Sequence, residues 1–105
     1  MSDNEQPEQE LDPKQKFNLE TGKLEWSELQ THFARGIVIM VNQGLDLIDI
    51  AVKLSEDDAK VIGELIEAGD VIRANDDHAR RWVENEPVFW AVVVSPWVLV
   101  QEIQD

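Results

Sequence analysis

The chain has 105 residues, a formal net charge of −13 and no cysteine. A chain of this length folds as one domain rather than two. The missing cysteine excludes disulfides, thiolate metal sites and a cysteine nucleophile, and the negative charge disfavours nucleic acid and anionic membranes while favouring basic proteins as partners.

The first thirteen residues are predicted to form a disordered acidic tail. They contain five carboxylates, no lysine or arginine and no aromatic residue. Such a segment cannot bury enough apolar surface to offset its ordering entropy. Residues 14–105 are predicted to form a single α+β domain, and they keep a net charge of −8 because they hold nine basic and seventeen acidic residues. The N-terminus also lacks the basic stretch and apolar run of a signal peptide, so a cytoplasmic location is expected.

The first part of the domain predicts two short helices and two strands. Residues 14–21 favour one or two helical turns, and residues 23–26 alternate polar and apolar as a short strand does. Ser27 has the spacing of a capping box, which predicts a helix that Gly36 ends. Residues 37–41 are all apolar and mostly β-branched, so they predict a central strand that is covered on both faces.

Residues 45–54 fit two patterns. Alternate positions are apolar, as in a strand, but the apolar residues also line one face of a helix and the polar residues repeat with helical spacing. A helix is favoured, with a strand as the alternative. Ser55 and Asp58 have the spacing of another capping box, which predicts a helix to Ala68 that ends at Gly69.

The next elements are a short edge strand over residues 70–74 and a helix that runs to about Asn85. Asn75 or Asp76 is its expected N-cap. The side chains expected to face inward from this helix are Ala79, Trp82 and Val83.

The C-terminal part predicts two further strands, residues 89–94 and 97–103. The favoured two-residue hairpin turns need positive φ, whereas proline is fixed near −65°. A bulged or kinked long strand, or a wider turn, is therefore expected at Ser95 and Pro96. Together the elements predict an α+β fold with a small mixed sheet of about four short strands and three to four helices.

Apolar residues occupy both alternation phases between Phe89 and Val100. Either helices cover both faces of this strand, or one face meets a second subunit in a homodimer. The chain has four tryptophans, but a stacking platform for nucleic acid also needs a basic groove. Only Arg73, Arg80 and Arg81 cluster, and carboxylates flank them, so core packing is the favoured role of the tryptophans.

Two acidic clusters are candidate metal sites: Glu56-Asp57-Asp58 and Asp76-Asp77-His78. Hard cations require several converging carboxylates. Both clusters lie at predicted helix starts, where carboxylates satisfy free N–H groups, and capping is the favoured interpretation. The two histidines, His32 and His78, have no zinc-site spacing. No metal or cofactor is therefore assigned, and an enzyme is not expected.

A resemblance to a known family is carried by residues 33–36, residues 45–58 and above all residues 90–101, which read Trp-Ala-Val-Val-Val-Ser-Pro-Trp-Val-Leu-Val-Gln. Hydrophobicity alone does not demand two tryptophans and a proline at those offsets. Over residues 14–102 the chain resembles a family of small bacterial proteins classed as a domain of unknown function, number twenty-two eighty-eight in that series. The resemblance implies a bacterial cytoplasmic protein and supplies no activity and no catalytic residues.

The function expected from the sequence is that of a non-enzymatic, acidic protein-interaction or regulatory module with a basic protein partner. It is not expected to bind nucleic acid or a membrane. The alternatives are a small metal-dependent enzyme that uses the acidic clusters and a structural homo-oligomer. The candidate interaction surface consists of Arg35, Asp46, Trp90, Pro96 and Trp97.

Overall fold

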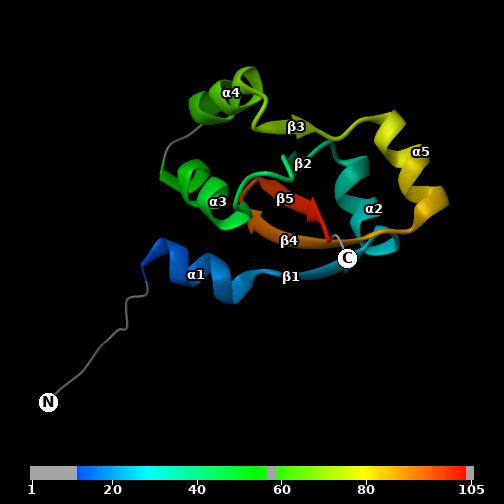
Figure 1. Ribbon diagram of the computed structural model, residues 1–105, viewed down its shortest axis with the longest axis horizontal. Helices are drawn as coiled ribbons and strands as arrows, with labels where there is room; N and C mark the ends of the chain where they lie inside the picture. The colour runs from blue at the N-terminus through cyan, green and yellow to red at the C-terminus, as the bar shows by residue number, and fades with distance from the viewer. Residues whose placement is uncertain (1–11, 57–58, 104–105) are drawn as a thin grey trace, which may run out of the picture.

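The structure is a computed structural model that describes residues 12–56 and 59–103. Most of the predicted tail, residues 1–11, lies outside the described residues. The elements shown in Figure 1 are, in chain order, α1 (Pro13–Glu20), β1 (Gly22–Glu25), α2 (Trp26–Ala34), β2 (Val38–Val41), α3 (Leu47–Glu56), α4 (Ala59–Ala68), β3 (Val71–Arg73), α5 (Asp76–Asn85), β4 (Val88–Val94) and β5 (Trp97–Glu102). No helix in this part of the chain is long and apolar enough to cross a membrane.

The strands form one mixed sheet in the order β1-β4-β5-β2-β3. Strands β2 and β5 are parallel, and the other three pairs are antiparallel. The predicted α+β class is confirmed, although the described residues hold five helices and five strands where fewer were expected. The interior position of β2 and the edge position of β3 also agree with the prediction.

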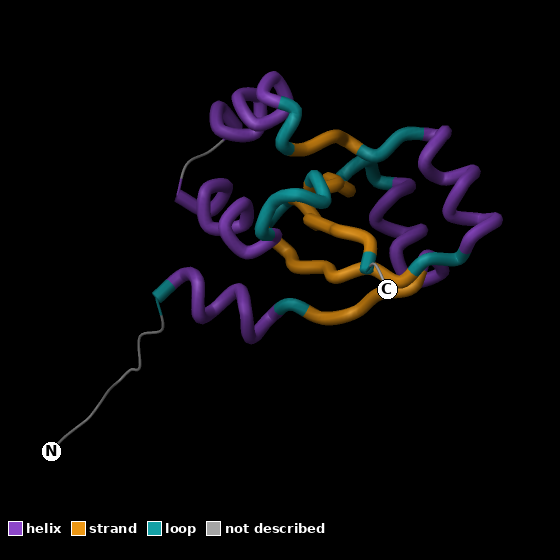
Figure 2. The backbone as a smooth tube through the Cα atoms, viewed as in Figure 1, coloured by secondary structure: helices purple, strands orange, loops and turns teal. Residues whose placement is uncertain are grey.

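Helices cover both faces of the sheet, so the molecule has three layers (Figures 1 and 2). On one face α1, α3 and α4 pack against the strands, and on the other face α2 and α5 do. In β4, Val92 and Val94 belong to the first cluster, whereas Phe89 and Ala91 belong to the second. Coverage from both sides explains why apolar residues occupy both alternation phases of this strand.

The helix predicted within residues 45–54 is confirmed as α3, but two predicted caps are wrong. Ser27 lies inside α2, which begins at Trp26, and the N–H of Glu25 donates to Oε1 of Glu28 over 3.0 Å. The same capping spacing therefore occurs two residues earlier, where it allows Trp26 to be buried at the start of the helix. Ser55 belongs to the last turn of α3, and its hydroxyl donates to the carbonyl oxygen of Val52 over 2.8 Å.

Two glycines end helices as predicted. Gly36 and Gly69 have φ values of 75° and 80°, the left-handed conformation that follows many helix C-termini and that favours glycine. In α5 the outcome is mixed: Trp82 is 1% exposed, but Val83, expected to face inward, is 58% exposed. The turn of the helix places the two neighbouring side chains on different sides, and the indole takes the buried one.

A two-residue hairpin joins β4 to β5, contrary to the expected bulge or wider turn. Val94 pairs with Trp97, so only Ser95 and Pro96 lie between the strands. The peptide bond between these two residues is cis. Neither Ser95 nor Pro96 has a positive φ, so the turn is not one of the two favoured two-residue hairpin types.

Candidate functional site

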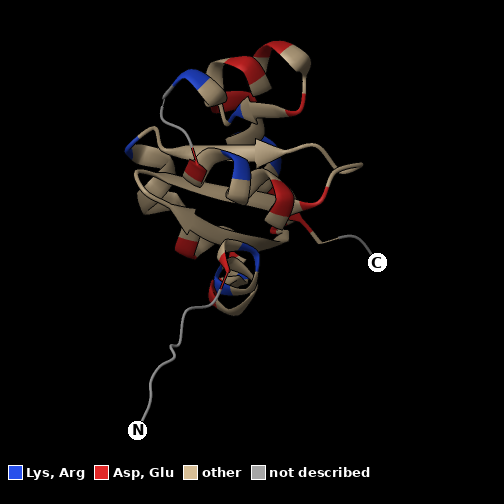
Figure 3. Cartoon of the chain, turned by 90° about the vertical axis from the view of Figure 1, so that its left-hand side faces the viewer, with Lys and Arg blue, Asp and Glu red and all other residues tan. Residues whose placement is uncertain are grey.

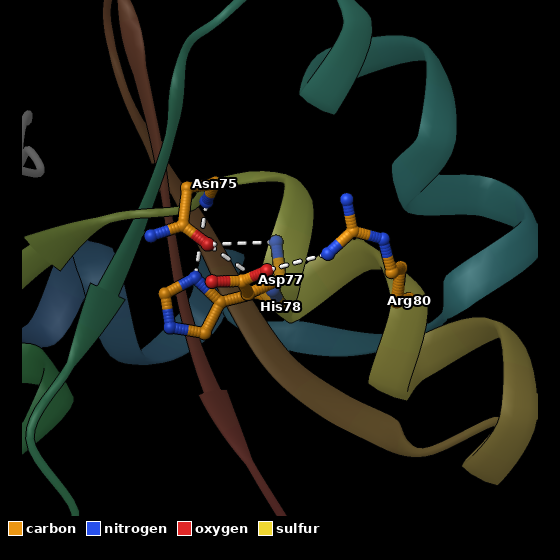
Figure 4. A network of polar contacts seen from close by, with 4 residues as sticks. All are labelled: Asn75, Asp77, His78 and Arg80. Carbon is orange, nitrogen blue, oxygen red and sulfur yellow. Dashed lines mark hydrogen bonds and ion pairs between the residues drawn. The ribbon is translucent and has the colours of Figure 1, made fainter.

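Asn75 and His78 cap α5, and the carboxylates of the acidic cluster, Asp76 and Asp77, lie in its first turn. Oδ1 of Asn75 accepts the N–H groups of Asp77 and His78 over 2.9 and 3.2 Å, and the N–H of Asn75 donates back to Nδ1 of His78 over 3.0 Å (Figure 4). The Asp77 carboxylate pairs with Arg80 at 2.6 Å. No group of three or more histidine, aspartate or glutamate side chains that could hold a metal occurs among residues 12–56 and 59–103. The other candidate ligands, Asp57 and Asp58, lie outside those residues.

The imidazole of His78 has a structural role in this cap. It stacks on Trp82 with 5.7 Å between ring centroids. Partial burial lowers the pKa of His78 below its ordinary value of 6.5, and the nearby Arg81 lowers it further, while Asp77 and Glu102 oppose the shift. The neutral ring is the form that accepts the N–H of Asn75. His78 therefore completes the capping box through Nδ1.

The five residues predicted to form one interaction surface lie in separate places. Arg35 and Pro96 line a shallow pocket of about 430 Å³ on the face covered by α2. Trp97 is half-buried, and the guanidinium of Arg73 lies 5.5 Å from its ring centre. Asp46 and Trp90 line a different groove, of about 470 Å³, on the face covered by α1 and α3. The predicted surface is thus divided between the two faces of the sheet.

We call the second of these sites the Trp90 groove. One wall comes from α1 and the residue that follows it, the other wall from the start of α3, and the floor from β4 and β5. Its lining residues are Asn18, Thr21, Asp46, Leu47, Ile48, Trp90 and Gln101. Leu47 and Ile48 are buried, whereas Trp90 is 39% exposed. The groove therefore combines apolar side chains on its α3 wall with an accessible aromatic ring, a carboxylate and amides.

The start of α3 positions the carboxylate of this groove. Oδ1 of Asp46 accepts the N–H of Ile48 over 2.8 Å and lies 3.4 Å from the N of Asp49. This is the role of an N-cap residue, and it holds the side chain at a fixed place on the groove wall. The amide of Gln101 donates to the carbonyl oxygens of Asn42 and Leu45 over 2.9 and 2.8 Å. These two hydrogen bonds from Gln101 therefore hold the loop on which Asp46 lies.

The Trp90 ring already attracts a cation. The ammonium of Lys23 lies 5.3 Å from its centroid, a distance at which the ring quadrupole attracts a positive charge. The helices beside the groove, α1 and α3, carry three lysines and three carboxylates. Figure 3 shows the charged residues mainly on the helices, with the sheet between them mostly uncharged. The groove thus joins an exposed aromatic face to the carboxylate of Asp46.

Of the residues that line this groove, only Asp46 and Trp90 were predicted. The residues that were not predicted are Asn18, Thr21, Leu47, Ile48 and Gln101, together with Lys23, whose ammonium lies over the Trp90 ring. The register in which β1 pairs with β4 places Lys23 opposite Trp90. The pairing of β4 with β5 places Gln101 opposite the same residue. No local pattern in the sequence indicates either pairing, because both depend on the order of the strands.

The comparisons with known proteins agree with this fold. The family described as "Protein of unknown function (DUF2288)" matches residues 12–102. The NMR solution structure of PA1075 from Pseudomonas aeruginosa is similar, with 37% sequence identity and a TM-score of 0.74, and the match covers 93% of this chain and 91% of that one. No match is found among curated proteins. The family resemblance expected from the sequence is confirmed: this chain belongs to the DUF2288 family.

Proposed function

We propose that the protein is a cytoplasmic binding module that captures a basic segment of a partner protein in the Trp90 groove. The observation that carries this proposal is the pairing, in one groove, of a 39% exposed tryptophan with the Asp46 carboxylate. An arginine or lysine side chain satisfies both features, because its charge meets the carboxylate and its body stacks on the indole.

The charge of the whole chain supports the same partner class. A net charge of −13 raises the local concentration of a cationic segment and speeds its encounter with the surface. The apolar side chains of Leu47 and Ile48 on the α3 wall then contribute contacts that do not depend on charge. The partner segment that fits this chemistry holds a basic residue next to an apolar one.

The first test uses arginine amide as a direct probe. Titration into isotopically labelled protein should shift the indole N–H resonance of Trp90 and the backbone resonances at the start of α3. The Asp46→Asn variant should abolish these shifts while α3 stays intact, because asparagine caps a helix as well as aspartate does. Glu64→Gln, which removes one charge from exposed α4, is the matched control and should bind as the wild type does.

The second test identifies the natural partner. The baits are the tagged wild-type protein and its tagged variants Asp46→Asn, Trp90→Ala and Glu64→Gln. Each bait is incubated with lysate of the host, and bound proteins are quantified by mass spectrometry. The proposal is supported by a basic protein that binds to the wild type and to Glu64→Gln but not to either groove variant. Its binding to the wild type should also be lost at high salt. A partner that both groove variants retain refutes the assignment of this groove.

A further inference from the structure

Strand β1 is an outer edge of the sheet. Its four residues pair with β4 on one side only. In Figure 1 no described element lies beyond it, α1 continues from one of its ends and α2 begins at the other. An open edge presents backbone N–H and C=O groups to a further strand, and natural edges are commonly protected by charged side chains. Lys23 and Glu25 are the charged residues of this edge, and both are exposed.

Exposed apolar side chains gather beside the same edge. Trp90 and Val88 lie opposite Lys23 and Glu25 in the β1–β4 register. Val83 shares a groove with Val88, and Leu19 lies in the last turn of α1 just before β1. Within the described residues, the large apolar side chains exposed in this region are Leu19 at 74%, Val83 at 58%, Trp90 at 39% and Val88 at 37%. Such a concentration marks an interaction surface.

We propose that a second copy of the chain pairs antiparallel with β1, on a two-fold axis that passes beside Leu24. In this register Leu24 lies opposite the partner's Leu24. Lys23 then lies opposite the partner's Glu25, and Glu25 lies opposite the partner's Lys23. The edge is therefore complementary in charge to itself, which is what a two-fold interface requires.

Exposed apolar side chains also lie near both ends of the strand. Antiparallel pairing brings the α1 end of one β1 next to the α2 end of the other. Leu19, which is 74% exposed, lies near the first end. A groove of about 480 Å³ lies at the second end and is lined by Trp26, Val83 and Val88 together with the polar residues Glu25, Ser27, Gln30 and Glu86. Each copy therefore brings one exposed leucine near the α2 end of its partner's strand. The dimer surface shares Trp90 with the proposed function, but it does not include Asp46.

The first measurement is the mass of the full chain in solution by light scattering and sedimentation. The chain is 12.0 kDa, and the observed mass should rise toward twice this value as concentration increases up to about 1 mM, a range that includes weak specific associations. Leu19→Ala should raise the dimer dissociation constant by about tenfold or more, because it removes an apolar side chain from each of the two symmetric contacts. A wild-type mass that stays at 12.0 kDa over the whole range overturns the proposal.

The charge pattern permits a stricter test by exchange of the two charges. Lys23→Glu places two glutamates on the edge, and Glu25→Lys places two lysines there. Each variant alone should be monomeric, because like charges then face one another across the axis. An equimolar mixture of the two variants should form a heterodimer with the mass of the wild-type dimer, and the double variant should dimerise by itself.

Matched controls separate the edge from net charge and from folding. Lys53→Glu and Glu64→Lys make the same charge changes on exposed positions of α3 and α4 and should leave the dimer unchanged. Far-UV circular dichroism checks that each edge variant folds. A dimer that survives in either single edge variant, or a mixture that stays monomeric, overturns the proposed pairing.

Discussion

Two tryptophans that pack together differ in one hydrogen bond, and this difference has a measurable consequence. Trp26 and Trp82 are both buried, at 8% and 1% exposure, with their ring centroids 5.3 Å apart. Nε1 of Trp82 donates to Oε2 of Glu102 over 3.2 Å. Nε1 of Trp26 is buried and has no partner among the described residues. Replacement of each tryptophan by phenylalanine should therefore change stability by different amounts.

The magnitude follows from the two indole N–H groups. Both substitutions remove the same apolar atoms, so the cost of the smaller ring cancels in the comparison. Trp82→Phe also loses a hydrogen bond to a charged group, worth about 1.5–3 kcal/mol, whereas Trp26→Phe removes a buried unsatisfied donor that costs about 1–3 kcal/mol. The free energy of unfolding should therefore be lower for Trp82→Phe by about 2.5–6 kcal/mol.

The assay is urea denaturation followed by far-UV circular dichroism, because the substitutions alter tryptophan fluorescence. The dependence of the free energy on urea should be equal in both variants, and the midpoints should differ. In thermal melts the difference corresponds to about 10 °C or more, at about 4–8 °C per kcal/mol for a domain of this size. Equal destabilisation by the two substitutions would refute the reasoning, since it would mean that the Trp26 N–H is as well satisfied as that of Trp82.

Three further predictions concern caps and turns. His78 has a lowered pKa in the folded state, so the unfolded chain binds the proton more readily. The free energy of unfolding should therefore fall as pH decreases below about 6.5. His78→Gln keeps a hydrogen-bond acceptor but has no such proton equilibrium, so its free energy of unfolding, measured by denaturation, should fall less over that range. Gly36→Ala should destabilise the protein by about 1–2 kcal/mol because Gly36 has a positive φ. Gly63→Ala in α4 should instead stabilise the protein by about 0.5–1 kcal/mol in the same assay, because an added Cβ there meets nothing within 4 Å. Asp46→Ala should cost about 1 kcal/mol through the lost cap, and Asp46→Asn should leave the thermal midpoint within about 2 °C.

Local patterns account for most of the elements and for the errors among them. Polar spacing identified α3 correctly, and the glycines after α2 and α4 marked real helix ends. The cap of α2 was misplaced because Glu25 and Ser27 have the same spacing to a capping partner, and only the burial of Trp26 separates them. That burial depends on Trp82, which lies far along the chain. Local pattern thus finds a helix, and tertiary contact decides at which residue it begins.

The candidate site depends on the order of the strands, which no local pattern indicates. Asp46 and Trp90 meet because β4 and β5 lie side by side in the middle of the sheet and the loop before α3 is bound to Gln101. Arg35 and Pro96 meet each other on the opposite face. Arg35 and Asp46 were predicted to flank the central strand, and Pro96 and Trp97 were predicted to lie at a kink. Neither feature determines on which face of the sheet a residue lies.

The charged and polar side chains that stand out in the sequence already make hydrogen bonds or ion pairs within the fold. The ring of His78 completes the cap of α5, and the carboxylate of Asp77 pairs with Arg80 of the same helix. The exposed apolar residues Leu19 and Val83 have no such use inside the fold. Burial of a side chain of this size would contribute about 1.5–3 kcal/mol, and each of these residues lacks that contribution while it is exposed. Several such side chains collect beside one short strand whose two charges complement each other under a two-fold axis. Contact with another molecule recovers that burial free energy, and the edge of β1 is where a second copy recovers it at both ends of the strand at once.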